Sequence, residues 1–285
     1  MRQRAISAVG IVILGLLPAL LGGPVFAIAF TLIALQSYRE LVALLKVGQR
    51  ELAAMGYVFI AAAGLLAWLK PDGRYLPLVV ALATFTPLVF IVFRQSDPVD
   101  ERDWASAIGP ALYLLLPTFG AIALRGAEGS VDREWFADLA GAMPFDGADT
   151  AKGLGWFLTA LLITWLSDTA AYLVGKSVGR TKLIPRVSPN KTVEGAIGGL
   201  VAAGITATVC VFAFGLDVHP LTSLILGVVL GVIGMLGDLC ESNLKRRAGV
   251  KDSGNLIPGH GGMLDRIDAL IFVLTATWAL LPLLP

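Results

Sequence analysis

Long apolar runs separated by short polar connections extend along the whole chain. Each run is long enough to cross a hydrocarbon core of about 30 Å as a helix. The apolar positions are continuous rather than alternating, and backbone groups in lipid must pair within their own segment, so helices are expected rather than strands. We therefore expect an all-α, polytopic membrane protein with about nine transmembrane helices. The predicted spans are residues 5–21, 24–46, 53–69, 75–93, 106–125, 154–175, 193–215, 221–244 and 265–284.

The composition indicates the same class of protein. Hydrophobic residues make up 56% of the 285 residues and charged residues only 15%, whereas a soluble domain carries about 25% charged residues. The formal net charge of +1 gives no broad positive field, so no nucleic-acid partner is expected. Cys210 and Cys240 lie in apolar stretches, and we interpret them as small hydrophobic residues rather than as a metal site or a disulfide.

Lysine and arginine are distributed unequally between the two sides of the predicted helices. If the N-terminus is cytoplasmic, the inner connections carry most of these residues, as the positive-inside rule requires. We therefore expect a plasma-membrane protein of the bacterial inner-membrane type, with its N-terminus inside and its C-terminus outside. The longest outer loop, residues 126–152, is acidic, and we interpret it as a solvated connection.

Polar residues divide the chain into two halves of one membrane domain. Residues 1–152 hold five predicted helices with short connections, and we interpret this half as a scaffold. Residues 153–285 hold four predicted helices with polar residues inside them and two charged loops, and we interpret this half as catalytic. In the eighth predicted helix, Gly227-x-x-x-Gly231 is a small-residue pattern that indicates close helix packing.

A very polar stretch joins the last two predicted helices, and ionisable groups at membrane depth usually indicate function. Asp265 and Asp268 would share a face at the start of the last helix, although favourable interaction with the helix dipole is a structural alternative. Facing helices could hold one Mg²⁺ between Asp238 and Asp265, because this ion is bound by few carboxylates together with phosphate oxygens. The helix face that contains Asp238 also carries Glu241, Ser242 and Lys245.

The loop between these acids is rich in cations and glycine. Its cations could bind phosphate groups, although cytoplasmic basic residues also determine topology or contact anionic lipids. Gly261 and Gly262 lead into a helix, where backbone N–H groups can approach an anion. His260 lies in the same turn and could hydrogen-bond a phosphate or transfer a proton. The candidate phosphate-binding cations are Lys245, Arg246 and Lys251.

A second polar group follows the sixth predicted helix. Asp168 lies well inside an apolar run, with Tyr172 one turn later, so its carboxylate needs a cation or a structural hydrogen bond. The loop that follows is basic, like the loop described above, and two basic loops on one side of a membrane indicate a polyphosphate and an anionic lipid. The candidate substrate contacts in this loop are Ser188, Asn190, Lys191 and Thr192.

Two common kinds of chemistry are missing from the sequence. The chain has no Gly-x-x-x-x-Gly-Lys-[Ser/Thr] loop, so an ATPase of the Walker type is not expected. No Ser/His/Asp order indicates nucleophilic acyl transfer.

The C-terminal half resembles the phosphatidate cytidylyltransferase family, whose members are also called CDP-diacylglycerol synthases. The resemblance covers residues 155–280 in detail, whereas the first 150 residues agree only in helix content. The main motif is filled at every fixed position: Ser242-x-Leu244-Lys245-Arg246-x₄-Lys251-Asp252-x-Gly254-x₂-Ile257-Pro258-x-His260-Gly261-Gly262-Met263-x-Asp265-Arg266-Ile267-Asp268. Shorter stretches that also look like the family's are Gly237-Asp238-Leu239-x-Glu241-Ser242, Ser188-Pro189-Asn190-Lys191-Thr192 and Asp168-x-x-Ala171-Tyr172-x₂-Gly175.

The resemblance implies a nine-helix membrane fold, a homodimer, and an active site in a funnel that faces the cytoplasm and opens to lipid. It also implies that Asp238 and Asp265 hold the catalytic Mg²⁺, with K⁺ as a candidate second cation. The expected catalytic residues are Asp238, Asp265, Lys245, Lys251 and His260. The expected substrate-binding residues are Ser188, Asn190, Lys191, Thr192, Ser242, Arg246, Gly261, Gly262 and Arg266. The weaker metal candidates are Asp168, Glu241, Asp252 and Asp268.

The expected reaction transfers a cytidylyl group from CTP to phosphatidate and yields CDP-diacylglycerol and pyrophosphate. Membrane lipids around the protein are further expected partners. Two alternatives stay open. A CTP-dependent polyprenol or phytol kinase could share the basic loops and Mg²⁺, but it would release CDP instead of pyrophosphate. An ion-coupled transporter could use Asp168 and Asp238 as a cation path, but it predicts two repeated halves with broken helices, and no such repeat is present.

Overall fold

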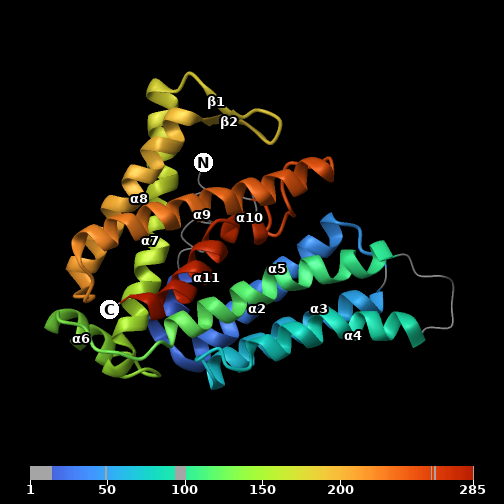
Figure 1. The fold of residues 1–285 in the computed structure, drawn as a ribbon, viewed down its shortest axis with the longest axis horizontal. Coiled ribbons are helices and arrows are strands. Elements are labelled where there is room, and N and C mark those ends of the chain that lie inside the picture. Colours follow the sequence, from blue (N-terminus) through green and yellow to red (C-terminus); the bar gives the residue numbers. More distant parts are fainter. Residues whose placement is uncertain (1–14, 49, 94–100, 258, 260, 285) are drawn as a thin grey trace. The chain divides into compact units, whose positions relative to one another are not determined.

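The computed structural model describes the chain except for residues 1–14, 49, 94–100, 258, 260 and 285 (Figure 1). The described residues are predominantly helical, and seven of their helices are long and apolar enough to span a membrane. The chain forms two compact units. One contains Met1–Ala123 and Asp252–Arg266, and the other contains Leu124–Lys251 and Ile267–Pro285. The segment that carries Asp265 therefore groups with the N-terminal helices, although we predicted it as part of the C-terminal half.

The predicted spans agree with the described helices except at the two ends of the chain. The first predicted span is described only from residue 15, and residues 15–21 are helical. The last predicted span is not one helix, because a turn at Asp268 and Ala269 separates α10, Leu264–Ile267, from α11, Leu270–Leu280. The Asp268 carboxylate accepts a hydrogen bond from the Ala269 amide (2.8 Å), a local contact that competes with helical pairing. Asp265 and Asp268 therefore do not share one continuous helix, and the total of nine helices stays a prediction.

In the unit that contains the N-terminal helices, α2 packs against α3 and α3 against α4. The Tyr38 side chain is fully buried in α2, and its hydroxyl donates to the Ala53 carbonyl oxygen of α3 (3.2 Å). Gly56 leaves room for that ring, since a Cβ at this position would collide with the Tyr38 hydroxyl. The helices of this unit are α2, Gly23–Leu44; α3, Arg50–Leu69; α4, Leu76–Phe93; most of α5, Glu101–Arg125; and α10.

In the other unit, close contacts between glycines and backbone hold three long helices together. These helices are α7, Ala151–Val178; α8, Val193–Phe214; and α9, Pro220–Arg247, with α11 packed against α7 and α9. A Cβ at Gly227 would lie 2.5 Å from the Ala203 carbonyl oxygen, and one at Gly231 would lie 2.8 Å from the Ala203 side chain. The predicted packing role of these two glycines is therefore confirmed, and their partner is α8.

A short antiparallel hairpin interrupts the otherwise helical fold between α7 and α8. It consists of β1, Lys182–Ile184, and β2, Ser188–Thr192. The Val187 amide donates to the Ile184 carbonyl oxygen (3.1 Å), and Pro185 occupies the second position of this turn, where its fixed φ is favourable. We did not predict this hairpin, because its strands are too short and too polar to show an alternating hydrophobic pattern.

The segment between α5 and α7, predicted as a solvated connection, is mostly exposed but contains two short helices. It contains α6, Glu134–Gly141, and η1, Ala148–Thr150. The fully buried Phe136 ring stacks on Phe214 at a centroid distance of 4.6 Å. The Arg125 guanidinium is also buried and pairs with the Asp146 carboxylate (2.9 Å). Figure 1 shows α6 at one end of α7 and the β1–β2 hairpin at the other end.

Candidate active site

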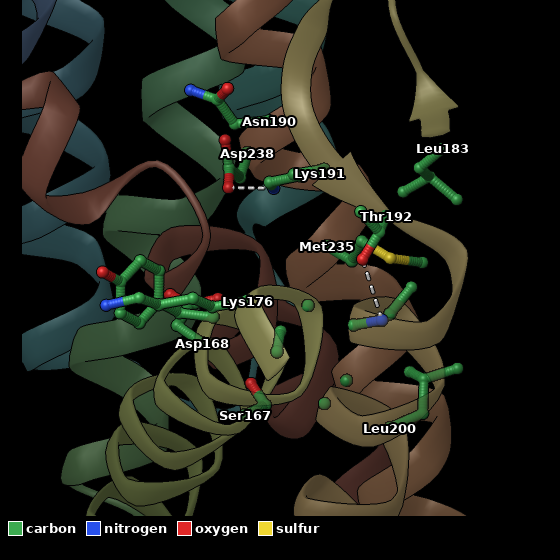
Figure 2. A pocket seen from close by; sticks show the side chains of 17 residues that line it. Ser167, Asp168, Lys176, Leu183, Asn190, Lys191, Thr192, Leu200, Met235 and Asp238 are labelled. Carbon is green, nitrogen blue, oxygen red and sulfur yellow. Dashed lines mark hydrogen bonds and ion pairs between the residues drawn. The ribbon is translucent and has the colours of Figure 1, made fainter. Parts of the chain in front are cut away.

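A pocket of about 440 Å³ lies between α7, α8, α9 and the hairpin, all of which belong to one compact unit (Figure 2). Its apolar walls come from the helices, and its polar groups come from several separate segments. The charged and polar residues that line it include Asp168, Lys176, Asn190, Lys191, Thr192 and Asp238. The structure therefore brings the two polar groups predicted near Asp168 and Asp238 to one cavity.

An ion pair between the Lys191 ammonium and the Asp238 carboxylate lines this pocket (Figure 2). Both side chains are partly accessible, with exposed fractions of 31% and 24%, so ligands can reach them. The Ser242 hydroxyl, one turn after Asp238, donates to the other carboxylate oxygen (3.2 Å). Asp168 is close enough to Asp238 and Lys191 to interact electrostatically with both. The pocket thus combines two carboxylates with a cation beside them.

Local backbone structure holds Asn190 and Lys191 at the pocket. Thr192 is the N-cap of α8, and its hydroxyl accepts a hydrogen bond from the Gly195 amide (3.1 Å). Gly195 is also a close-packing position, since a Cβ there would lie 2.7 Å from the Ala171 carbonyl oxygen of α7. The Thr192 side chain is buried but also lines the pocket, so its substrate contact stays a prediction beside this structural role.

Two predicted phosphate-binding cations are held by protein groups. The Lys245 ammonium pairs with the Glu241 carboxylate one turn earlier, and both residues are buried. The Arg246 guanidinium donates to the carbonyl oxygens of Val187 (3.3 Å) and Val250 (3.2 Å). These contacts fasten α9 to the hairpin and to the chain that follows, and neither residue is among those that line the described pocket.

Asp265 belongs to the other compact unit, where it organises the loop that precedes it. One oxygen of its carboxylate accepts hydrogen bonds from the amides of Ser253 and Gly262, both at 2.8 Å, and lies 2.9 Å from the Ser253 hydroxyl. Gly261 has a φ of +82°, and a Cβ there would lie 2.6 Å from the same oxygen. Glycine is thus required at this position for conformation and for space. The pairing of Asp265 with Asp238 stays a prediction, because the two residues belong to separate units.

The remaining predicted residues have simpler surroundings. Ser188 is half-buried on β2 opposite Ile184, and the Asp268 carboxylate interacts electrostatically with Asp238 and Lys245. His260 lies outside the described residues. Lys251, Asp252 and Arg266 are exposed, as are Asp168, Asn190 and Arg246 among the residues described above.

The carboxylates of the pocket are a partial ligand set for a divalent cation. Among the described residues, no group of three or more His, Cys, Asp and Glu side chains is arranged to hold a metal ion. Mg²⁺ does not need such a group, because it usually keeps several waters and binds one or two carboxylates together with substrate phosphates. Asp168 and Asp238, with the Lys191 ammonium already beside Asp238, therefore fit this ion as partial ligands.

One residue at the Asp265 loop was not predicted. Glu40 lies in α2, is only 7% exposed, and accepts hydrogen bonds from the amides of Met263 and Leu264, both at 2.9 Å. The sequence feature that could have identified Glu40 is its position inside the second predicted apolar span, because an ionisable group there needs a partner. The partner itself is more than 200 residues away in sequence, so no spacing pattern could reveal it.

These features define a polytopic helical membrane protein with a pocket lined by both carboxylates and cations. A model of the cytidylyltransferase family matches residues 2–284, and the chain belongs to this family. A phosphatidate cytidylyltransferase of Staphylococcus aureus (strain COL) is similar over the whole length, with 34% identity over 277 residues and 96% of each chain covered.

Identity is higher in alignments that cover part of the chain. A phosphatidate cytidylyltransferase of Bacillus subtilis (strain 168) is 48% identical over 131 residues, which are 46% of this chain and 49% of that protein. One of Staphylococcus haemolyticus (strain JCSC1435) is 47% identical over 127 residues, or 45% of this chain and 49% of that protein. These two alignments span about half the length of the relatives that they match.

Proposed function

We propose that the protein transfers a cytidylyl group from CTP to phosphatidate and releases pyrophosphate, which makes CDP-diacylglycerol for phospholipid biosynthesis. Membership of the cytidylyltransferase family and the names of its relatives support this substrate pair. The single observation that carries the proposal is the pocket in which Lys191 pairs with Asp238 beside Asp168. Such a pocket can neutralise phosphate charge and bind a cation. Both substrates are anionic, so both need this neutralisation.

The reaction that we propose is an in-line displacement at the α-phosphorus of CTP. A phosphate oxygen of phosphatidate forms the new P–O bond, the bond to the β-phosphate breaks, and pyrophosphate leaves. The attacking oxygen is already anionic, so little general-base catalysis is needed, and positioning and charge neutralisation provide most of the rate. Lys191 is the cation best supported for the phosphate groups, since it is partly accessible at the pocket. Asn190, next to it on β2, can donate hydrogen bonds to phosphate oxygens.

We propose that Asp238 holds the Mg²⁺, with Asp168 across the pocket and Asp265 as the further ligand expected from the sequence. When bound, this ion would neutralise charge on the phosphate oxygens and on the leaving pyrophosphate. Ser242 donates to one Asp238 oxygen and thereby orients the carboxylate. K⁺ as a second cation, a homodimer and a site that faces the cytoplasm belong to the same proposal.

The test is an assay of the purified full-length protein in detergent with CTP, Mg²⁺ and short-chain phosphatidate. The expected products are CDP-diacylglycerol and pyrophosphate, in equal amounts, and both should require all three additions. A CTP-dependent lipid kinase would release CDP and leave a phosphorylated lipid without cytidine. A transporter would form neither product, so either result would reject the proposed reaction.

A further inference from the structure

We propose that Glu40 in α2 is a positioning residue for the 252–263 loop and, through it, for Asp265. The inference rests on the proposed function, because it assigns Glu40 to the support of a carboxylate that we expect to act in cytidylyl transfer. Glu40, the loop and Asp265 belong to one compact unit. Glu40 is thus a residue of the predicted scaffold half with a function in the reaction.

Both oxygens of the Glu40 carboxylate have hydrogen-bond donors within reach. One oxygen accepts from the Met263 amide (2.9 Å) and the Gln36 side-chain amide (3.0 Å). The other oxygen accepts from the Leu264 amide (2.9 Å) and lies 3.2 Å from the Ser253 hydroxyl. Glu40 therefore binds both ends of the loop, at Ser253 and at the residues that immediately precede Asp265.

The Ser253 hydroxyl links Glu40 directly to Asp265. It lies 3.2 Å from a Glu40 oxygen and 2.9 Å from the Asp265 oxygen that also accepts the Ser253 and Gly262 amides. A hydroxyl has one proton, so it donates to one carboxylate at a time. The two carboxylates consequently share a donor, and a change at Glu40 alters the hydrogen bonding of Asp265.

The loop backbone is built closely around the Glu40 side chain. A Cβ at Gly254 would lie 3.1 Å from the Glu40 carboxyl carbon, and a Cβ at Gly262 would collide with the Glu40 carboxylate and the Ser253 hydroxyl. These two glycines are fixed positions of the motif found in the sequence, and their small size is explained by the presence of Glu40. The loop backbone therefore packs closely around the Glu40 carboxylate, and glycine at these two positions leaves the space that it occupies.

A carboxylate is the group that these donors require. Each Glu40 oxygen faces a backbone N–H, so the NH₂ group of a glutamine would meet one of these N–H groups in either orientation. One buried backbone donor would then lose its acceptor, which is costly in a buried position. Glu40→Gln keeps the size of the side chain and tests the hydrogen bonds rather than the packing.

The experiment compares Glu40→Gln with the wild-type protein and with Glu134→Gln, an exposed position at the start of α6. Groups that hydrogen-bond a metal-binding side chain typically change metal affinity or activity by about 10–100-fold. For Glu40→Gln we therefore expect the half-saturating Mg²⁺ concentration to rise, or kcat to fall, by roughly tenfold or more. The KM for phosphatidate should change by less than about twofold, because Glu40 is a positioning residue and not a substrate contact.

A second readout does not depend on activity. Hydrogen exchange of a peptide that covers residues 252–266 should be faster in Glu40→Gln than in the wild type, because either the Met263 or the Leu264 amide loses its acceptor. Glu134→Gln should match the wild type in both readouts. If Glu40→Gln does not fold, Ser253→Ala removes only the hydroxyl that the two carboxylates share, and it should also raise the Mg²⁺ requirement.

The outcomes separate this inference from the proposed function. An active wild type together with unchanged Mg²⁺ dependence and unchanged exchange in Glu40→Gln would overturn the role of Glu40. An unchanged Mg²⁺ dependence in Ser253→Ala would overturn it if Glu40→Gln does not fold. An inactive wild type would reject the proposed function instead, while faster exchange in Glu40→Gln would still support the positioning of the loop.

Discussion

At Asp238 and Asp265, neighbouring groups satisfy two carboxylates in different ways. Asp238 is paired with the Lys191 ammonium and the Ser242 hydroxyl, at a pocket that ligands can enter. Asp265 accepts backbone amides of its own loop through one oxygen. The first arrangement depends on charge and the second on geometry, so substitutions at the two positions should have different consequences.

Asp265→Asn should abolish the formation of CDP-diacylglycerol while the protein stays folded. The asparagine carbonyl oxygen can still accept the Ser253 and Gly262 amides, so the loop should persist, but the negative charge proposed for Mg²⁺ is lost. We expect turnover to fall by at least about 100-fold, with little change in the thermal midpoint in detergent. Turnover near the wild-type value would remove Asp265 from the mechanism.

Lys191→Met should weaken the binding of CTP. It removes the cation beside Asp238 and leaves that carboxylate without its ion-pair partner at the pocket. A hydrogen bond to a charged group contributes about 1.5–3 kcal/mol, so the KM for CTP should rise roughly 10- to 100-fold. Lys182→Met, on β1 but not among the described residues that line the pocket, is the matched control and should leave the KM unchanged. Equal effects in both variants would contradict the assignment of Lys191.

Sequence spacing predicted contacts within one helix but not contacts between distant segments. The i, i+4 spacing of Asp238 and Ser242 correctly placed them together. Asp168, singled out as a carboxylate within an apolar run, lines the pocket as an exposed residue. Two hydrogen bonds could not be predicted, because tertiary packing decides them: the one from Arg246 to the Val187 carbonyl oxygen and the one from the Met263 amide to Glu40. Spacing alone therefore identified neighbours along one helix, and the catalytic roles of the predicted site residues stay predictions.

At the scale of elements, small residues decide how closely α8 and α9 approach. Gly227→Ala should destabilise the protein, because the new Cβ would lie 2.5 Å from the Ala203 carbonyl oxygen and force the helices apart. Overpacking of this kind costs about 1–3 kcal/mol. The measurement is the thermal midpoint in detergent.

Gly15→Ala is the control for this substitution, since a Cβ at Gly15 would meet nothing within 4 Å. It should leave the midpoint unchanged or raise it slightly, because alanine is the better helix former by about 1 kcal/mol. A midpoint for Gly227→Ala equal to or above that of Gly15→Ala would show that the close approach does not limit stability.

The long apolar helices were predictable from hydrophobicity, and three shorter elements were not. The β1–β2 hairpin is mostly polar, and its strands are only three and five residues long. α6 is eight residues long within an acidic segment, and its buried Phe136 becomes apparent only through its contact with Phe214. The interruption at Asp268 lies between apolar residues, so hydrophobicity alone predicts a continuous helix there.

At the scale of the whole molecule, each of the two compact units combines segments that are far apart in the sequence. The segment Asp252–Arg266 groups with the N-terminal helices, and Glu40 in those helices accepts its hydrogen bonds. Hydrophobicity cannot predict such a grouping, because it indicates which segments are buried and not which segments pack together. The N-terminal half thus contributes to the support of the expected catalytic loop.

The predicted orientation can be tested by cysteine labelling from outside the cell. α6 and the hairpin lie at opposite ends of α7, whose 28 residues span about 42 Å, enough to cross a membrane. In a background that carries Cys240→Ser, which removes an exposed native thiol, Asp138→Cys should react with a membrane-impermeant maleimide in intact spheroplasts. Arg186→Cys should react only after the membrane is opened, and the reverse pattern would invert the orientation.

The most direct test of cytidylyl transfer follows the two ends of the CTP triphosphate. Purified protein is supplied with Mg²⁺, phosphatidate and CTP that carries ³²P on either the α- or the γ-phosphate. We predict that the α-label enters the lipid product and that the γ-label leaves as pyrophosphate. A γ-label in the lipid, with the α-label released in CDP, would contradict it and identify a kinase.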